Sequence, residues 1–158
     1  GLLHARELFR DSGPFILHNV DVLSDIPLEE VFATHRTTAD RTLLASVAVQ
    51  RRPSRRTLLF DEVGLMGWEN RKGEGMDVAR EQVRDPLGPV VSMAFTGIHV
   101  IDPAIFRLTR RSGSFSIITL YLELAAAGFS IRPIDVTGHW WMDVGTPERL
   151  AEARARLP

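Results

Sequence analysis

The chain has 158 residues, of which 44% are hydrophobic and 25% charged, and its formal net charge is −1. These values are ordinary for one globular domain, so we expect residues 1–158 to form a single domain without affinity for nucleic acid. The absence of cysteine excludes disulfides and thiolate metal sites.

No apolar run approaches the roughly 20 residues that a membrane-spanning helix needs, and no signal-peptide pattern opens the sequence. We therefore expect a cytoplasmic protein that has no membrane partner. The sequence leaves a homo-oligomer open. The first residue is Gly1 instead of methionine and a helical pattern follows it directly, which indicates a piece of a larger protein.

The first part of the chain predicts a helix over 2–11, a strand over 15–19 and a helix from Pro27 to His35. A buried strand over 43–49 follows, because that run is apolar and rich in β-branched residues. Two further strand-like runs flank Glu62-Val63-Gly64, which is the spacing of a β-hairpin over 56–69.

Gly, Pro and charged residues dominate 70–89, so we expect a loop there, or a loop with a short strand. The longest predicted strand covers 90–101, where Gly97 indicates a bulge or a close backbone approach. A short helix then begins at Pro103, and a longer one runs from a Ser116 cap to about Ala127.

A strand over 130–136 and a terminal helix with Thr146 as its N-cap complete the chain. Strands and helices alternate over most of the sequence. The pattern therefore predicts an α/β fold with a mixed, mostly parallel sheet and a β-hairpin insertion.

Two aspartates stand out because each follows an apolar strand-like run at a turn. Asp21 ends Phe15-Ile16-Leu17-His18-Asn19-Val20-Asp21, and Asp143 precedes Val144-Gly145-Thr146. Carboxylates at strand ends are typical of Mg²⁺ sites that are completed by substrate phosphates. On the pattern alone, a turn residue or helix cap explains Asp21 about as well, and bonding to loop amides is a comparable alternative for Asp143.

Arginines cluster in Gln50-Arg51-Arg52-Pro53-Ser54-Arg55-Arg56. Such a run can attract phosphates, but Pro and Ser mark it as a loop, so we favour a solvated turn. The histidines on apolar segments, among them His99, are interpreted as core or edge residues, and no transition-metal spacing is present.

Three motifs together resemble a known family. The segment that ends at Asp21, the segment Phe95-Thr96-Gly97-Ile98-His99-Val100 and the segment Trp141-Met142-Asp143-Val144-Gly145-Thr146-Pro147-Glu148 are similar to landmarks of the sugar-1-phosphate nucleotidyltransferases. The similarity is closest to mannose-1-phosphate guanylyltransferases and N-acetylmuramate-1-phosphate uridylyltransferases. It implies the C-terminal two-thirds of a Rossmann-like, three-layer nucleotidyltransferase fold that lacks the first βαβ portion.

The resemblance also implies the chemistry. A nucleotidyl group passes from a nucleoside triphosphate to a sugar-1-phosphate, which gives an NDP-sugar and pyrophosphate. Asp21 and Asp143 would be the catalytic ligands of Mg²⁺. Asn19, Thr96 and Gly97 would belong to the substrate pocket, and Gly1 would be the last glycine of a turn that contacts the nucleobase. Apart from the resemblance, the adjacent Trp140 and Trp141 suggest that Trp141 stacks on a sugar, but a strand edge with one ring in the core is the favoured interpretation.

The sequence departs from the family pattern in two places. The Gly-rich phosphate loop is absent, and the family's Glu-Lys-Pro segment has no direct counterpart. Glu69 can be matched to its glutamate and would line the sugar pocket. Lys72, the only lysine of the chain, or Arg71 would take the phosphate-binding role of the displaced lysine, with a solvated loop lysine as the alternative.

Two rival interpretations follow. One is a glycosyltransferase of similar architecture, in which Asp21 and Asp25 would mimic an Asp-x-Asp metal motif despite their wider spacing. The other is a degenerate nucleotidyltransferase-like module that binds a sugar nucleotide or regulates a partner without turnover.

Overall fold

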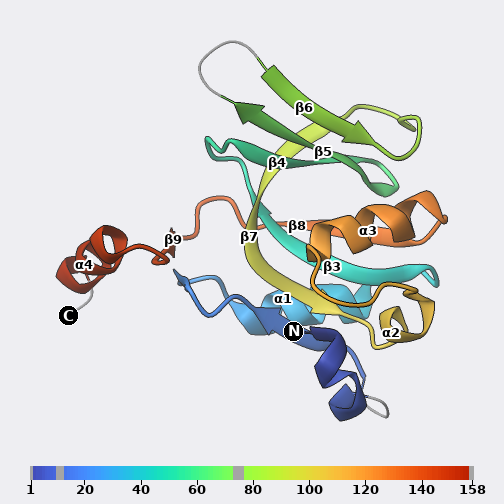
Figure 1. The fold of residues 1–158 in the computed structure, drawn as a ribbon, viewed down its shortest axis with the longest axis horizontal. Coiled ribbons are helices and arrows are strands. Elements are labelled where there is room, and N and C mark those ends of the chain that lie inside the picture. The colour runs from blue at the N-terminus through green and yellow to red at the C-terminus, as the bar shows by residue number, and fades with distance from the viewer. Residues whose placement is uncertain (1, 10–12, 73–76, 157–158) are drawn as a thin grey trace.

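The structure is a computed structural model that describes residues 2–9, 13–72 and 77–156 (Figure 1). The strands are β1 (Phe15–His18), β2 (Val22–Ser24), β3 (Leu43–Gln50), β4 (Arg56–Asp61), β5 (Gly64–Lys72), β6 (Asp77–Gln82), β7 (Val91–Ile101), β8 (Ser130–Asp135) and β9 (Trp141–Asp143). The helices are the 3-10 helix η1 (Leu2–Phe9) and the α-helices α1 (Leu28–Thr37), α2 (Ile105–Leu108), α3 (Ile117–Ala126) and α4 (Pro147–Arg156).

One seven-stranded sheet organises the chain. Its order is β6-β5-β4-β7-β3-β8, and β1 pairs with the second half of β7. Strand β7 is long enough to pair with β4 through its first residues and with β1 through its last ones. This strand therefore joins the β4–β5–β6 meander to the rest of the sheet.

The α/β class and the Rossmann-like fold are confirmed, but the expected mostly parallel pairing is wrong. Among the described strands, only β3 and β8 pair in parallel. The physical reason is the connection between β3 and β7. It is a meander of strands instead of a crossover helix, and such a connection returns the chain in the antiparallel direction.

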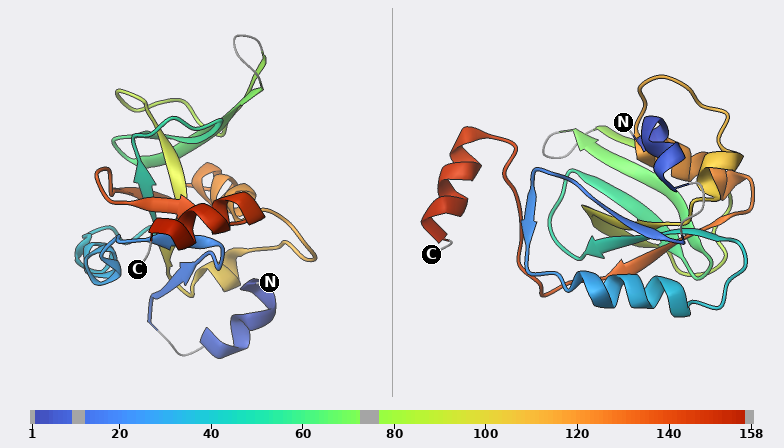
Figure 2. Two further views of the ribbon diagram at one scale, coloured as in Figure 1. Left: turned by 90° about the vertical axis from the view of Figure 1, so that its left-hand side faces the viewer. Right: turned by 90° about the horizontal axis from the view of Figure 1, so that it is seen from below.

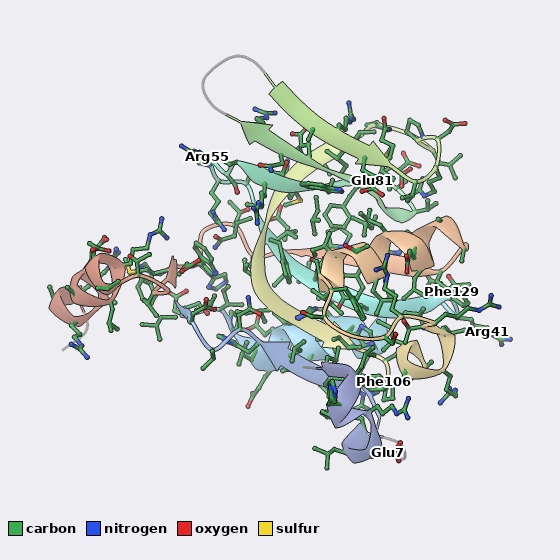
Figure 3. The ribbon with its side chains drawn as sticks, in the orientation of Figure 1. Glu7, Arg41, Arg55, Glu81, Phe106 and Phe129 are labelled. Carbon is green, nitrogen blue, oxygen red and sulfur yellow. The ribbon has the colours of Figure 1, made fainter. Side chains whose placement is uncertain are left out.

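Helices cover both faces of the sheet, which gives three layers (Figure 2). On one face, α2 and α3 bury the larger apolar cluster, and Phe106 and Phe129 lie on this side (Figure 3). On the other face, Val31 of α1 packs on a smaller cluster that contains Ala48, Ile98 and Val100. Both clusters contain residues of β3 and β7, because the side chains of these strands alternate between the two faces of the sheet.

A two-stranded ribbon stands beside the main sheet. Strand β2, which the sequence analysis did not predict, pairs antiparallel with β9 so that Val22 lies opposite Asp143. Helix α4 continues from β9 and points away from the rest of the chain (Figure 1). The ribbon brings the Asp21 turn next to Asp143, although the two residues are far apart in the sequence.

Local signals fixed several boundaries. The Ser116 hydroxyl accepts a hydrogen bond from Ile118 N, so the predicted cap of α3 is confirmed. Of the two possibilities for 70–89, a loop or a loop with a short strand, the second is confirmed, because β6 forms the edge of the meander within that range. The predicted N-terminal helix is a 3-10 helix over 2–9.

None of the helices in the described part of the chain is both long enough and apolar enough to span a bilayer.

Candidate functional site

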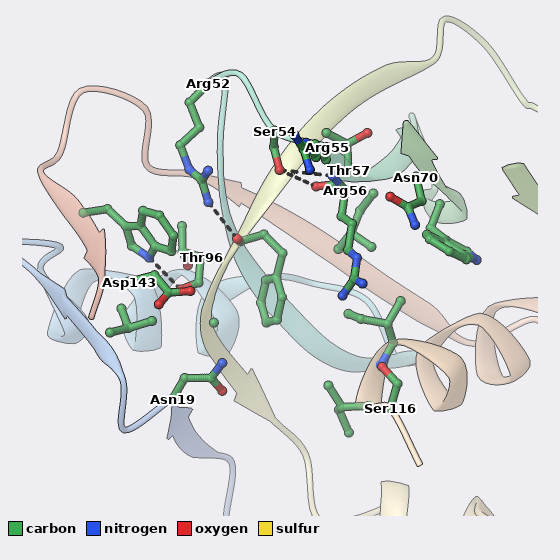
Figure 4. A pocket seen from close by; sticks show the side chains of 18 of the residues that line it. Asn19, Arg52, Ser54, Arg55, Arg56, Thr57, Asn70, Thr96, Ser116 and Asp143 are labelled. Carbon is green, nitrogen blue, oxygen red and sulfur yellow. Dashed lines mark hydrogen bonds between the residues drawn. The ribbon is translucent and has the colours of Figure 1, made fainter. Parts of the chain in front are cut away.

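A cavity of about 1020 Å³ opens where the β2–β9 ribbon meets the main sheet (Figure 4). Its wall combines the β1–β2 turn, the β3–β4 loop, β5, β7, the N-terminus of α3, β9 and α4. A cavity of this size accommodates a ligand as large as a nucleotide sugar. Six predicted site residues lie in this wall: Asn19, Asp21, Thr96, Gly97, Trp141 and Asp143.

The carboxylates of Asp21 and Asp143 converge at this cavity. A Cβ added to Gly145 would lie 3.1 Å from Asp143 Oδ1 and 3.3 Å from Asp21 Oδ2, so oxygens of both side chains approach one point. Backbone contacts fix the arrangement, because Val144 N donates to Asp21 O at 2.7 Å. The β2–β9 pairing thus holds two negative charges close together, an arrangement that a cation would stabilise.

The donor set suits Mg²⁺. Within the described ranges, the Asp21 carboxylate has no hydrogen-bond or ion-pair partner, and Asp143 Oδ1 accepts only from Gly145 N at 2.9 Å. No group of three or more His, Cys, Asp or Glu side chains is assembled for a metal by these residues. Two carboxylates with the remaining positions left to water or phosphate is the usual protein share of a Mg²⁺ site.

Gly97 lets β7 contact the Asn19 side chain closely. Its φ of +83° is in the left-handed region, and a Cβ there would lie 2.8 Å from Asn19 Nδ2. The backbone supports this contact, because Asn19 N donates to Gly97 O at 2.9 Å. The close backbone approach predicted for Gly97 is therefore confirmed, and its partner is the residue two positions before Asp21.

Hydrogen bonds of Thr96 and Trp141 connect β7 to β3 and to the β2–β9 ribbon. The Thr96 hydroxyl donates to Ala48 O at 2.8 Å, and Trp141 Nε1 donates to Thr96 O at 2.7 Å. The Trp141 ring is half-buried and also carries the Arg52 guanidinium at 3.9 Å from the ring centroid. The arginine therefore occupies one face of the ring that the Trp140-Trp141 pair suggested for a sugar.

Four arginines line the cavity, and the favoured prediction of a solvated turn missed three of them: Arg52, Arg55 and Arg56. The fourth, Arg149, lies in the first turn of α4 and has no distinguishing signal in the sequence. None of the four has an ion-pair partner among the described residues. Burial lowers the pKa of Arg52 below its ordinary value, Arg149 lowers it further, and Asp143 opposes them. The positive wall favours a phosphate-bearing ligand.

Glu69 is not part of the cavity wall. It is buried between β4, β5 and β7, where Thr57, Ser92 and Arg71 donate to its Oε1. Burial raises the pKa of Glu69, but these hydrogen bonds outweigh that effect and leave it below its ordinary value. Because side chains alternate along β5, its neighbour Asn70 faces the cavity instead.

Two further predicted site residues cannot be placed. Gly1 lies outside the described residues, and so does the side chain of Lys72, whose backbone ends β5. Arg71, the alternative to Lys72, is paired with Glu69. Asp25, which the glycosyltransferase interpretation requires, accepts from Trp140 N at 2.8 Å and lies 3.3 Å from His139 Nδ1, outside the cavity wall.

Solved structures show the same fold. A putative glucose-1-phosphate thymidylyltransferase from Bacillus anthracis superposes with a TM-score of 0.69 at 16% identity, over 98% of this chain and 58% of that one. The inositol-1-phosphate CTP transferase from T. maritima gives 0.66 at 13% identity, over 98% and 58%. A UTP-bound UGPase from Acinetobacter baumannii gives 0.71 at 12% identity, over 98% and 54%.

No profile of a known protein family matches the sequence. The chain spans little more than half the length of the structures that it resembles. At these identities the likeness establishes the fold, and the cavity chemistry has to carry any conclusion about activity.

Proposed function

We propose that the protein transfers a nucleotidyl group from a nucleoside triphosphate to a sugar-1-phosphate, with release of pyrophosphate. The observation that carries this proposal is the convergence of Asp21 and Asp143 at a cavity whose wall bears four arginines, none of which forms an ion pair with the described residues. The fold that it shares with glucose-1-phosphate thymidylyltransferase and UGPase structures supports the same reaction class.

Asp21 and Asp143 would hold Mg²⁺. When bound, the ion neutralises charge that develops on the phosphates during in-line displacement. The chain supplies the geometry for this role, because the β2–β9 ribbon fixes both carboxylates through backbone hydrogen bonds. Such pre-set positions avoid reorganisation at the moment of reaction.

The other wall residues would bind the substrate. Asn19, held against Gly97, offers an amide to hydroxyls or a base, and the arginines oppose the negative charge of the phosphates. Thr96 would support the site indirectly, because its carbonyl accepts from Trp141 Nε1 and its hydroxyl donates to the β3 backbone. The phosphate role of Lys72, the nucleobase role of Gly1 and the narrower resemblance to guanylyl- or uridylyltransferases remain predictions.

The test is a product assay on the protein that carries this chain. It is incubated with Mg²⁺, each of the four common nucleoside triphosphates and a set of sugar-1-phosphates, and products are identified by mass spectrometry. We expect one triphosphate to give an NDP-sugar and an equal amount of pyrophosphate.

Two other outcomes contradict the proposal. Binding of an NDP-sugar without turnover of any triphosphate would indicate a binding module. Transfer of a sugar from an NDP-sugar to an acceptor, without pyrophosphate release, would indicate a glycosyltransferase.

A further inference from the structure

Arg52 differs from the other arginines of the cavity in being fixed by the fold. It follows β3, its guanidinium lies 3.9 Å from the centroid of the Trp141 ring, and its Nη2 donates to Phe95 O at 3.2 Å. Trp141 is itself held by the neighbouring carbonyl of Thr96. Two successive β7 carbonyls thus orient the cation and the ring beneath it (Figure 4).

The hydrogen-bonding capacity of this guanidinium is not used up. Arg52 Nε is buried and has no hydrogen-bond partner in the described structure. Its charged neighbours are Asp143, which is attractive, and Arg149, which is repulsive. A half-buried cation with an unsatisfied buried donor and a like charge nearby is costly to maintain unless an anion binds to the rest of the guanidinium.

The adjacent residue, Arg51, is an arginine of the same loop with a structural ion pair, and it serves as a comparison. Arg51 is exposed, and its Nε pairs with Asp135 at 3.2 Å, outside the cavity. The two residues have the same chemistry and neighbouring positions. Arg51 forms an ion pair with Asp135, whereas Arg52 faces the cavity and has no carboxylate within ion-pair distance in the described part of the chain.

We propose that Arg52, braced on Trp141, binds a phosphate group of the ligand immediately beside the Asp21–Asp143 pair. A planar guanidinium suits this role because its fork of donors matches two phosphate oxygens and loses little freedom once it is stacked. Trp141 is then a positioning residue. The proposal deepens the proposed function and rests on it for the identity of the ligand.

The experiment is an NMR titration of the protein with α-D-glucose 1-phosphate in the presence of EDTA, so that Mg²⁺ does not contribute. We expect saturable shifts of one arginine Nε–H resonance and of the Trp141 Nε1–H resonance. Inorganic phosphate should move the same two resonances, because the phosphoryl group is the recognised part.

Arg52→Gln should raise the Kd at least tenfold, and Arg52→Lys should lie between Arg52→Gln and the wild type, because it keeps the charge without the fork. Arg51→Gln is the matched control and should bind as the wild type does. A melting curve checks that each variant is folded, and Arg52→Lys replaces Arg52→Gln in the comparison if the latter does not fold.

Wild-type affinity in the Arg52 variants, or the absence of any saturable shift in the wild type, would overturn the proposal. Neither result depends on turnover. A protein that makes no NDP-sugar yet shows Arg52-dependent binding contradicts only the proposed function, and an active enzyme with unaffected Arg52 variants contradicts only this inference.

Discussion

Two carboxylate sites in this molecule have opposite surroundings. Asp61, at the end of β4, is buried and receives hydrogen bonds from Arg84 and from the backbone amides of Val63 and Leu87. Asp21 and Asp143 approach one point at the cavity, and neither has an ion-pair partner among the described residues. The chain thus provides hydrogen-bond and ion-pair partners for the buried Asp61 and no ion-pair partner, among the described residues, for the two cavity carboxylates. This difference is expected where a ligand supplies the missing charge.

The largest effect on stability should come from removing the ion pair between Asp61 and Arg84. Asp61→Ala leaves the mostly buried Arg84 guanidinium unpaired, and we expect it to lower the free energy of unfolding by about 3 kcal/mol in urea titrations. Asp85→Ala, an exposed carboxylate next to Arg84, should change it by less than about 0.5 kcal/mol. Equal stability of the two variants would contradict the structural role of Asp61.

Gly97→Ala should cost about 2 kcal/mol, because a side chain is strained at this φ and its Cβ collides with Asn19. Gly128→Ala is the matched control, since its φ of +87° imposes similar strain but nothing lies within 4 Å of the added Cβ. Urea titrations of both variants separate strain from collision. If Gly97→Ala costs no more than Gly128→Ala, the Asn19 contact does not constrain this position.

The buried His99 should make stability depend on pH. Burial lowers its pKa to about 3, and its Nδ1 lies 2.5 Å from the Tyr121 hydroxyl. Because the unfolded chain protonates near pH 6.5, the neutral ring contributes stability that is complete above that pH and is lost as the pH falls toward 3.

We expect a loss of about 1 kcal/mol per pH unit between pH 6 and pH 4, measured by urea unfolding. His99→Gln should be less stable at pH 7.5 and should show a flatter pH profile. A profile of the same slope would assign the acid sensitivity to other groups.

The smallest effect on stability should come from the open site. Asp21→Asn and Asp143→Asn keep the shape of the side chains, and each removes one of two charges that repel each other. Urea titrations should give unfolding free energies within about 0.5 kcal/mol of the wild type. A loss of several kcal/mol would show that these carboxylates are structural, like Asp61.

The sequence predicted the elements better than their arrangement. Local signals located β3, the β4–β5 hairpin and the Ser116 cap of α3. Helix–strand alternation could not reveal that the meander sends β7 back antiparallel to β3, because strand direction depends on which strands meet in space. For the same reason β2, whose pairing with β9 brings the two aspartates together, was not predicted.

The candidate site was predictable where a residue type carries its own chemistry. Asp21, Asp143 and Gly97 stood out as carboxylates at turns and as a glycine inside a strand, and the structure brings all three to one cavity. Arg52 was noted only as one of a cluster for which a solvated turn was favoured, because its contact with a tryptophan from a distant strand is not visible in the sequence. Glu69 could be matched only by resemblance, and strand alternation turns it away from the cavity.

The most direct test of the central claim is the Mg²⁺ dependence of pyrophosphate release in Asp21→Asn, Asp143→Asn and the matched control Asp85→Asn. We predict that the two cavity variants lose at least 100-fold in rate at every Mg²⁺ concentration, with melting temperatures close to that of the wild type, and that the control retains full activity. Wild-type rates and Mg²⁺ dependence in both cavity variants would contradict the assignment of Asp21 and Asp143 as the metal ligands.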